Sequence, residues 1–162
     1  SLNWYYNQDD SRWTNTTIGI SDSTMGDYGC AITDIAMIFQ YHGISMTPGQ
    51  LAKESIYAWD LIYWPKKWGS INCINCPPPH TTPFDWFKLD REIGAGYPVI
   101  VFIRANGRGA GHYVVVHHKT DDGRYVVHDP LFGANIYLES TRAYISALYK
   151  TTTSLDQMII YH

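Results

Sequence analysis

One cysteine in this sequence stands where a reactive thiol could be held at the start of a buried helix. Cys30 follows a glycine and opens the largely apolar run CAITDIAMIFQYH (30–42), while the other two cysteines lie together in CINC. A helix N-terminus stabilises a thiolate through its free N–H groups and its macrodipole. Gly26 and Gly29 would allow a close approach to that thiol. Cys30 is therefore a candidate nucleophile, although free cysteines are commonly small, buried core residues.

A base for such a thiol must come from a distant part of the chain. In GAGHYVVVHH, His112 stands directly after a glycine-rich loop, at the start of a predicted strand, where its side chain can face a cleft. His117 and His118 lie further along this strand, where a core or surface role is expected. His128 alternates to the face opposite that of its neighbour Asp129 and is not a candidate. A strand histidine also has a purely structural interpretation.

Asp129, in VHDPLFG, is the candidate for the residue that orients the histidine. Residues 112–118 and 124–128 predict a hairpin, in which an even loop without a bulge puts His112 and Asp129 on one face. A four-residue loop (119–122) would place them directly opposite each other. A two-residue turn would instead place Asp129 opposite Val116, about 13 Å along the strand from His112. The arrangement therefore requires the longer loop or a bend.

The elements that must position these residues can be read from periodicity and capping signals. Residues 30–42 are apolar on nearly all sides, which predicts a buried helix that ends at Gly43. TPGQLAKESIYAW (47–59) predicts a second helix, with Thr47, Pro48 and Gln50 as its start signals. TPFDWFKLDREIGAG (82–96) predicts a third, capped by Thr82, begun by Pro83 and favoured by Asp85 in its first turn.

The C-terminal half of the chain has the composition of strands. β-branched and aromatic runs occupy residues 98–103, 112–118, 124–128, 135–138 and 157–161, with a short helix expected over 139–149. Residues 1–29 have no sustained period and predict irregular structure. Helices followed by strands favour an α+β fold with an antiparallel sheet. At 162 residues, we expect a single domain over 1–162.

Composition narrows the possible partners. Lys and Arg number 12 against 15 Asp and Glu, with no basic stripe, so a nucleic-acid partner is not expected. The longest apolar run, 98–103, is too short to span a bilayer. Thirteen tyrosines and six tryptophans suit the binding of a peptide or another polymer, although aromatic cores have the same composition.

The segment 56–80 is an aromatic insertion that contains CINC. It holds three tryptophans and a proline triplet, and we interpret it either as a lid or substrate wall, or as an insertion that packs its own rings. Cys73 and Cys76, with His80 nearby, lack the further ligand that a zinc site needs, so no metal or cofactor is expected. A short disulfide is expected if the protein is exported, and free thiols otherwise.

Four blocks together resemble a known family. YYNQDDSRW, TMGDYGCAITDIAMIFQYHG, GHYVVV and VHDPLFG are similar to the double-glycine peptidases that process bacteriocins, and in particular to standalone C39-like domains of the papain-like clan. The resemblance covers the N-terminal third and residues 98–133. It implies a papain-like α+β fold, with a buried nucleophile helix and flanking helices packed on a C-terminal antiparallel sheet.

The resemblance also implies roles for four residues. Cys30 would be the nucleophile, His112 the general base and Asp129 its orienting partner. Gln8 would donate its side-chain amide to an oxyanion hole beside the Cys30 N–H. The expected function is a cysteine peptidase that acts through a thioester.

Two alternatives remain open at this point. The same residues could serve a cell-wall amidase or an acyl transferase, or the fold could be a peptide-binding module without turnover. Because the domain is rich in glycine and aromatic residues, is poor in lysine, and begins at SLNWYYNQ as an excised mature domain would, we expect a bacterial protein that is secreted or displayed on the cell surface.

Overall fold

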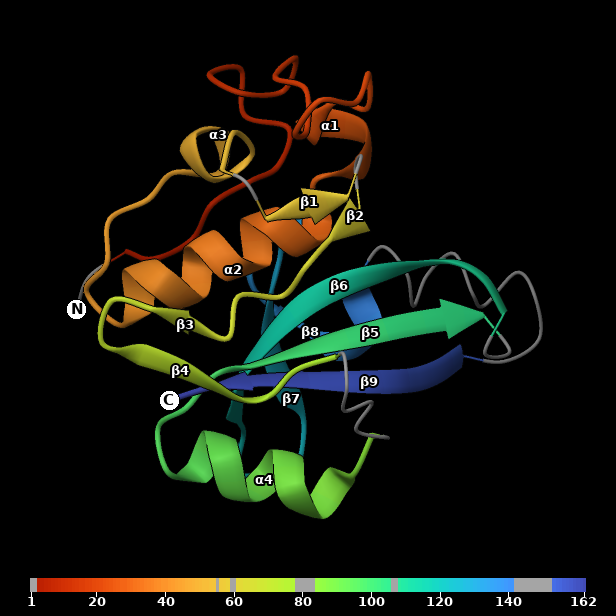
Figure 1. The fold of residues 1–162 in the computed structure, drawn as a ribbon. Coiled ribbons are helices and arrows are strands. Elements are labelled where there is room, and N and C mark those ends of the chain that lie inside the picture. Colours follow the sequence, from red (N-terminus) through yellow and green to blue (C-terminus); the bar gives the residue numbers. More distant parts are fainter. Residues whose placement is uncertain (1–2, 55, 59–60, 78–83, 106–107, 142–152) are drawn as a thin grey trace.

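An antiparallel sheet with helices on both faces organises the molecule (Figure 1). The structure is a computed structural model, and it describes residues 3–54, 56–58, 61–77, 84–105, 108–141 and 153–162. Helix α2 (Cys30–Tyr41) packs on one face of the sheet, and helix α4 (Trp86–Gly94) packs on the other. The expected α+β class with an antiparallel sheet is confirmed.

The main sheet contains seven strands within the described residues, and every pairing is antiparallel. Their order is β3-β4-β9-β5-β6-β7-β8, so the last strand of the chain, β9, lies inside the sheet. Their bounds are β3 (Lys67–Trp68), β4 (Ile71–Asn75), β5 (Val99–Ala105), β6 (Arg108–Lys119), β7 (Tyr125–Asp129), β8 (Gly133–Tyr137) and β9 (Thr153–Tyr161). Strands β1 (Tyr57–Ala58) and β2 (Leu61–Ile62) form a separate pair.

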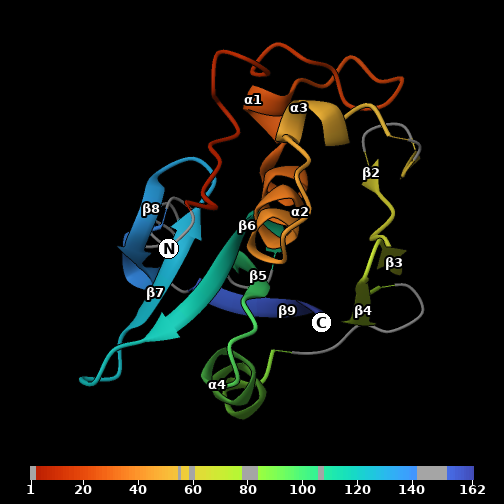
Figure 2. The same ribbon diagram turned by 90° about the vertical axis from the view of Figure 1, so that its left-hand side faces the viewer.

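Two apolar clusters hold the layers together, because alternate strand residues face opposite sides. Ile100, Val115 and Ile159 pack with the buried face of α2, while Val99, Val101 and Val114 pack with Leu89 of α4. Figure 2, which looks along α2, shows this helix on the sheet face away from α4. Because α2 is buried along nearly its whole length, its N-terminal residue is fixed relative to strand β6.

The helix predictions were confirmed in part. Helix α2 matches the predicted helix 30–42, and Gly43 after it has a positive φ of 85°. The capping box at Thr47 is present, but helix α3 (Pro48–Leu51) ends after four residues, so the helix predicted over 47–59 is wrong beyond its first turn. Short helices depend on tertiary packing, and here the chain continues into strand β1.

Helix α4 begins later than the sequence predicted. Asp85 is its N-cap and accepts the N–H groups of Phe87 and Lys88, while Thr82 and Pro83 lie outside the described residues. The irregular region 1–29 also contains a short helix, α1 (Met25–Tyr28). The helix expected over 139–149 falls mostly outside the described residues, and 138–140 form a 3₁₀ turn, η1 (Leu138–Ser140). None of the described helices is long and apolar enough to cross a bilayer.

Candidate functional site

The structure brings Cys30, His112 and Asp129 into one cluster. Cys30, a half-buried residue, is the first of α2, and it lies near enough to the His112 ring for each group to shift the pKa of the other. His112, on β6, is 2% exposed, and its Nε2 lies 2.7 Å from Oδ1 of Asp129, which is fully buried at the end of β7. This order of thiol, imidazole and carboxylate can transfer a proton from sulfur to nitrogen and stabilise the resulting imidazolium.

The β6–β7 register that joins His112 to Asp129 differs from both predicted hairpins. Lys119 pairs with Tyr125 across an odd, five-residue connection, and a bulge between Val116 and His118 then shifts the register by one residue. Val115 consequently pairs with His128, and the next step along β7 puts Asp129 opposite Val114. Asp129 is therefore two residues from the position opposite His112 and on the same face, about 7 Å along the strand.

Two glycines allow the chain to pack closely just before α2. A Cβ on Gly29 would lie 2.5 Å from the Met25 carbonyl oxygen, and a Cβ on Gly26 would lie 2.4 Å from Oγ1 of Thr14. The N–H groups of the first helical turn have no acceptor within the helix. The backbone N–H groups of Ala31 in this turn and of Tyr113 on β6 both act to lower the pKa of the Cys30 thiol.

Burial and mutual contact act in opposite directions on this pair. Burial raises the pKa of the Cys30 thiol, but the hydrogen bond and charge of His112 and the two backbone N–H groups bring that pKa below its ordinary value. Burial lowers the pKa of His112, but its hydrogen bonds with Asp129 and Cys30 raise that pKa to about 9. These shifts favour the charged forms of both groups, the thiolate and the imidazolium.

A turn and the N-terminal segment fix Asp129. Its Oδ1 accepts the backbone N–H groups of Leu131 at 2.8 Å and Phe132 at 3.2 Å, an Asx turn for which Asp-Pro followed by Gly is a typical sequence signal. The Tyr5 hydroxyl donates to the Asp129 carbonyl oxygen at 2.6 Å, and Asn7 donates to Tyr5 and to the Leu131 carbonyl. Tyr5 and Asn7 were not predicted from the sequence, because no local pattern distinguishes them from other polar loop residues.

Gln8 lies between the two halves of this site. Its backbone N–H donates to the Pro130 carbonyl at 2.8 Å, and its Nε2 donates to the carbonyl oxygens of Gly26 at 3.0 Å and Met25 at 3.4 Å. The side chain is 1% exposed. Gln8 thus joins the turn after Asp129 to the loop before Cys30, and no hydrogen bond from its amide to Cys30 occurs among the described residues.

A cavity of about 570 Å³ lies at the opposite end of α2 from Cys30. Its walls include Trp4, Tyr41, His117, His118 and His128. Tyr41 is the last residue of α2, about 16 Å along the helix axis from Cys30. Burial lowers the pKa of His117 to about 4 and that of His128 to about 3, so both rings are neutral at physiological pH. Within the described residues, no group of three or more His, Cys, Asp or Glu side chains is arranged to hold a metal ion.

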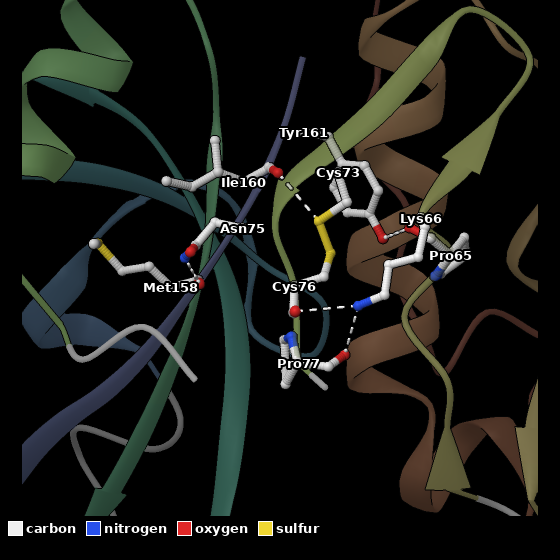
Figure 3. Close-up of a disulfide and its surroundings, with 9 residues drawn as sticks. All are labelled: Pro65, Lys66, Cys73, Asn75, Cys76, Pro77, Met158, Ile160 and Tyr161. Carbon is white, nitrogen blue, oxygen red and sulfur yellow. Dashed lines mark hydrogen bonds between the residues drawn. A yellow bond between two sulfur atoms is a disulfide. The ribbon is translucent and has the colours of Figure 1, made fainter. Parts of the chain in front are cut away.

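The aromatic segment 56–80 packs largely against the core in its described part. Trp64 is 6% exposed and contacts Tyr113, the neighbour of His112, while Trp68 lies against Phe39 of α2. Cys73 and Cys76 form a disulfide at the end of β4, and the Cys73 sulfur also contacts the Ile160 carbonyl oxygen (Figure 3). The disulfide settles the pairing that the sequence left open. Cys30 is the free cysteine of the chain.

Comparison with known proteins identifies the family. A search of curated proteins and a search of solved structures each gave no match. The family described as Peptidase_C39 like matches residues 4–156, which include Gln8, Cys30, His112 and Asp129. Because this match spans nearly the whole sequence, the chain belongs to the Peptidase_C39 like family.

Proposed function

We propose that this protein is a cysteine peptidase that cleaves peptide bonds through Cys30, His112 and Asp129. The observation that carries the proposal is the environment of the His112 ring: its Nε2 lies 2.7 Å from Oδ1 of Asp129, and the same ring lowers the pKa of the Cys30 thiol. Membership of a peptidase-like family supports the same reaction class. A thiolate beside an imidazolium is the reactive state that such a reaction needs.

In the acylation step, the Cys30 sulfur attacks the carbonyl carbon of the scissile peptide bond and forms a tetrahedral oxyanion. His112 then donates its proton to the leaving amine, the C–N bond breaks, and an acyl thioester remains on Cys30. In the second step, the now neutral His112 takes a proton from water, whose oxygen attacks the thioester. Release of the carboxylic acid product restores the thiolate–imidazolium pair. Asp129 keeps the ring oriented throughout.

The oxyanion would be stabilised by the backbone N–H of Cys30 and by the side-chain amide of Gln8. Support for the role of Gln8 is its place against the loop that leads into Cys30, with one of its two Nε2 contacts long at 3.4 Å. Loss of one oxyanion donor typically lowers kcat by a factor of about 10²–10³. Gln8→Ala should therefore lower kcat strongly and change KM little.

We further propose that the arrangement is papain-like and that the protein works outside the cytoplasm. A nucleophile at the start of a buried helix, facing a base on an antiparallel sheet, supports the first statement. The Cys73–Cys76 disulfide supports the second, because disulfides persist in oxidising compartments. A peptide or protein is the proposed substrate.

The proposal is tested by incubating the purified protein and Cys30→Ala with a mixture of peptides and, separately, with cell-wall peptide fragments. Mass spectrometry of the products, and of the protein itself, detects new termini and the thioester. Cleavage of peptides by the unaltered protein alone supports a peptidase. If only the cell-wall fragments react, by release of an amine or by transfer of their acyl group to an amine acceptor, the protein would instead be an amidase or a transferase. If neither protein turned over any of these substrates, the protein would instead be a peptide-binding module.

A further inference from the structure

Asp34 is a buried carboxyl group that the proposed reaction does not use. It lies in the middle of α2 among apolar side chains, is fully buried, and neither of its side-chain oxygens has a hydrogen-bond partner among the described residues. An isolated carboxylate is very costly in such surroundings, whereas a protonated carboxyl group is much less so. Its surroundings therefore favour the neutral acid.

The position of Asp34 ties it to the nucleophile. Residues four apart lie on the same helix face, so Asp34 is one turn beyond Cys30, about 6 Å along the axis. The titratable groups that act on it come from three elements: Cys30 on α2, Asp129 on β7 and Tyr5 in the N-terminal segment. Burial, followed by the charges of Cys30 and Asp129, raises the pKa of Asp34 well above its ordinary value.

We propose that Asp34 is an electrostatic positioning residue for Cys30: it keeps its proton while Cys30 is a thiolate, and its ionisation opposes that thiolate. The inference rests on the proposed nucleophile but adds a group that takes no part in the chemical steps. With Asp34 neutral, the thiolate, the imidazolium and the Asp129 carboxylate carry one net negative charge. An ionised Asp34 would bring this buried cluster to two.

The coupling must be reciprocal, since two ionisations that oppose each other shift each other's pKa by the same amount. Removal of the thiolate charge must therefore lower the pKa of Asp34. A like charge within about 4–6 Å shifts a pKa by about one unit or more. If Asp34 served packing alone, its pKa would depend only on burial. Replacement of the small side chain at Cys30 leaves that burial nearly unchanged, so the pKa of Asp34 would not move.

The experiment compares the protein with Cys30→Ser, in which Asp34 is intact and the neighbouring group stays neutral. The carboxyl carbon of Asp34, assigned by nuclear magnetic resonance with Asp34→Asn as a check, is titrated in both proteins. We expect its pKa to lie well above the ordinary range in the unaltered protein and to fall by about one unit in Cys30→Ser. Asp90, an exposed carboxylate paired with Lys119 at 3.0 Å, is the matched control and should titrate identically in both.

The ultraviolet absorbance of the thiolate, measured as the difference between the two proteins, separates the possible failures. If a thiolate forms at neutral pH and the Asp34 pKa is the same in both proteins, the coupling is refuted while the proposed nucleophile stands. If no thiolate forms at neutral pH, the proposed function itself fails. An equal shift at Asp90 would show a change in the whole fold, and it would also overturn the inference.

Discussion

The charge on Asp129 should stabilise the folded protein in a way that depends on pH. Asp129→Asn removes the charge but keeps an oxygen that can accept the Leu131 and Phe132 N–H groups. The pKa of His112 rises from 6.5 to about 9 in the folded protein, and each pKa unit corresponds to about 1.4 kcal/mol. The buried imidazolium therefore contributes about 3 kcal/mol to the free energy of unfolding, with Asp129 as a main cause.

The sign of this contribution fixes the pH window. Because the folded pKa lies above the unfolded value, the stabilisation is complete below pH 6.5 and is lost as pH rises through about 9. Urea unfolding of both proteins, followed by tryptophan fluorescence across this range, should show Asp129→Asn less stable by up to about 3 kcal/mol at the acidic end. The gap should narrow toward the alkaline end.

Asp90→Asn is the matched control for this comparison. Asp90 also pairs with a cation, Lys119, but both side chains are about 40% exposed, and such surface pairs contribute at most about 1 kcal/mol. Asp90→Asn should change the free energy of unfolding only slightly, and this change should not vary between pH 6.5 and 9. A stability gap for Asp129→Asn that has the same size at both ends of the range would refute the reasoning, because it would arise from packing rather than from proton binding.

Three further predictions concern the start and the interior of α2. His112→Ala should slow the alkylation of Cys30 by iodoacetamide at neutral pH, because the thiol then loses its cationic neighbour; an unchanged rate would show that the helix alone activates the sulfur. Gly29→Ala should lower the free energy of unfolding by about 1–3 kcal/mol, because the new Cβ would meet the Met25 carbonyl at 2.5 Å. In the control Gly94→Ala no atom lies within 4 Å of the new Cβ, so its free energy of unfolding should stay within about 1 kcal/mol of that of the unaltered protein. Asp34→Asn should stabilise the protein increasingly as pH rises above the pKa of an aspartate in the unfolded chain. A carboxyl group whose pKa is raised in the folded protein destabilises the fold as pH rises, and the amide does not. A stability difference that does not change with pH would contradict this prediction.

The parts of the fold that the sequence predicted are those with strong local signals. The apolar helix 30–42 and the five C-terminal strand runs carry their own periodicity, so their existence follows from residues close together in the chain. Cys30 starts α2 as predicted. The prediction that His112 starts a strand after a glycine-rich loop is wrong, because β6 begins at Arg108 and the stretch 109–111 is already extended and continues the pairing of β6 with β5.

The parts that the sequence did not predict depend on contacts between distant segments. Strands β1–β4 are two to five residues long and acquire their partners through β9 or through one another, so the local pattern contains little of this pairing. The bulge between Val116 and His118 has no sequence signature either, and it alone decides whether Asp129 shares a face with His112. The surroundings of Asp34 could not be predicted either, because the position of one carboxyl group in an apolar run does not show which residues of other elements pack around it.

The reactivity proposed for Cys30 is a property of the assembled sheet and helix rather than of either element. Burial alone would raise the pKa of the thiol and lower that of the imidazole, which removes both charges. Their mutual contact opposes both effects, together with Asp129 acting on the imidazole and the N–H groups of Ala31 and Tyr113 acting on the thiol. A small separation of α2 from β6 would therefore weaken the charged state of both groups. The strand that carries His112 is itself closely packed in the sheet: a Cβ at Gly111, next to His112, would lie 2.4 Å from Cζ of Phe102 on β5. A side chain added at Gly111 should therefore displace β6 beside His112 and weaken the ion pair while every reacting group remains present.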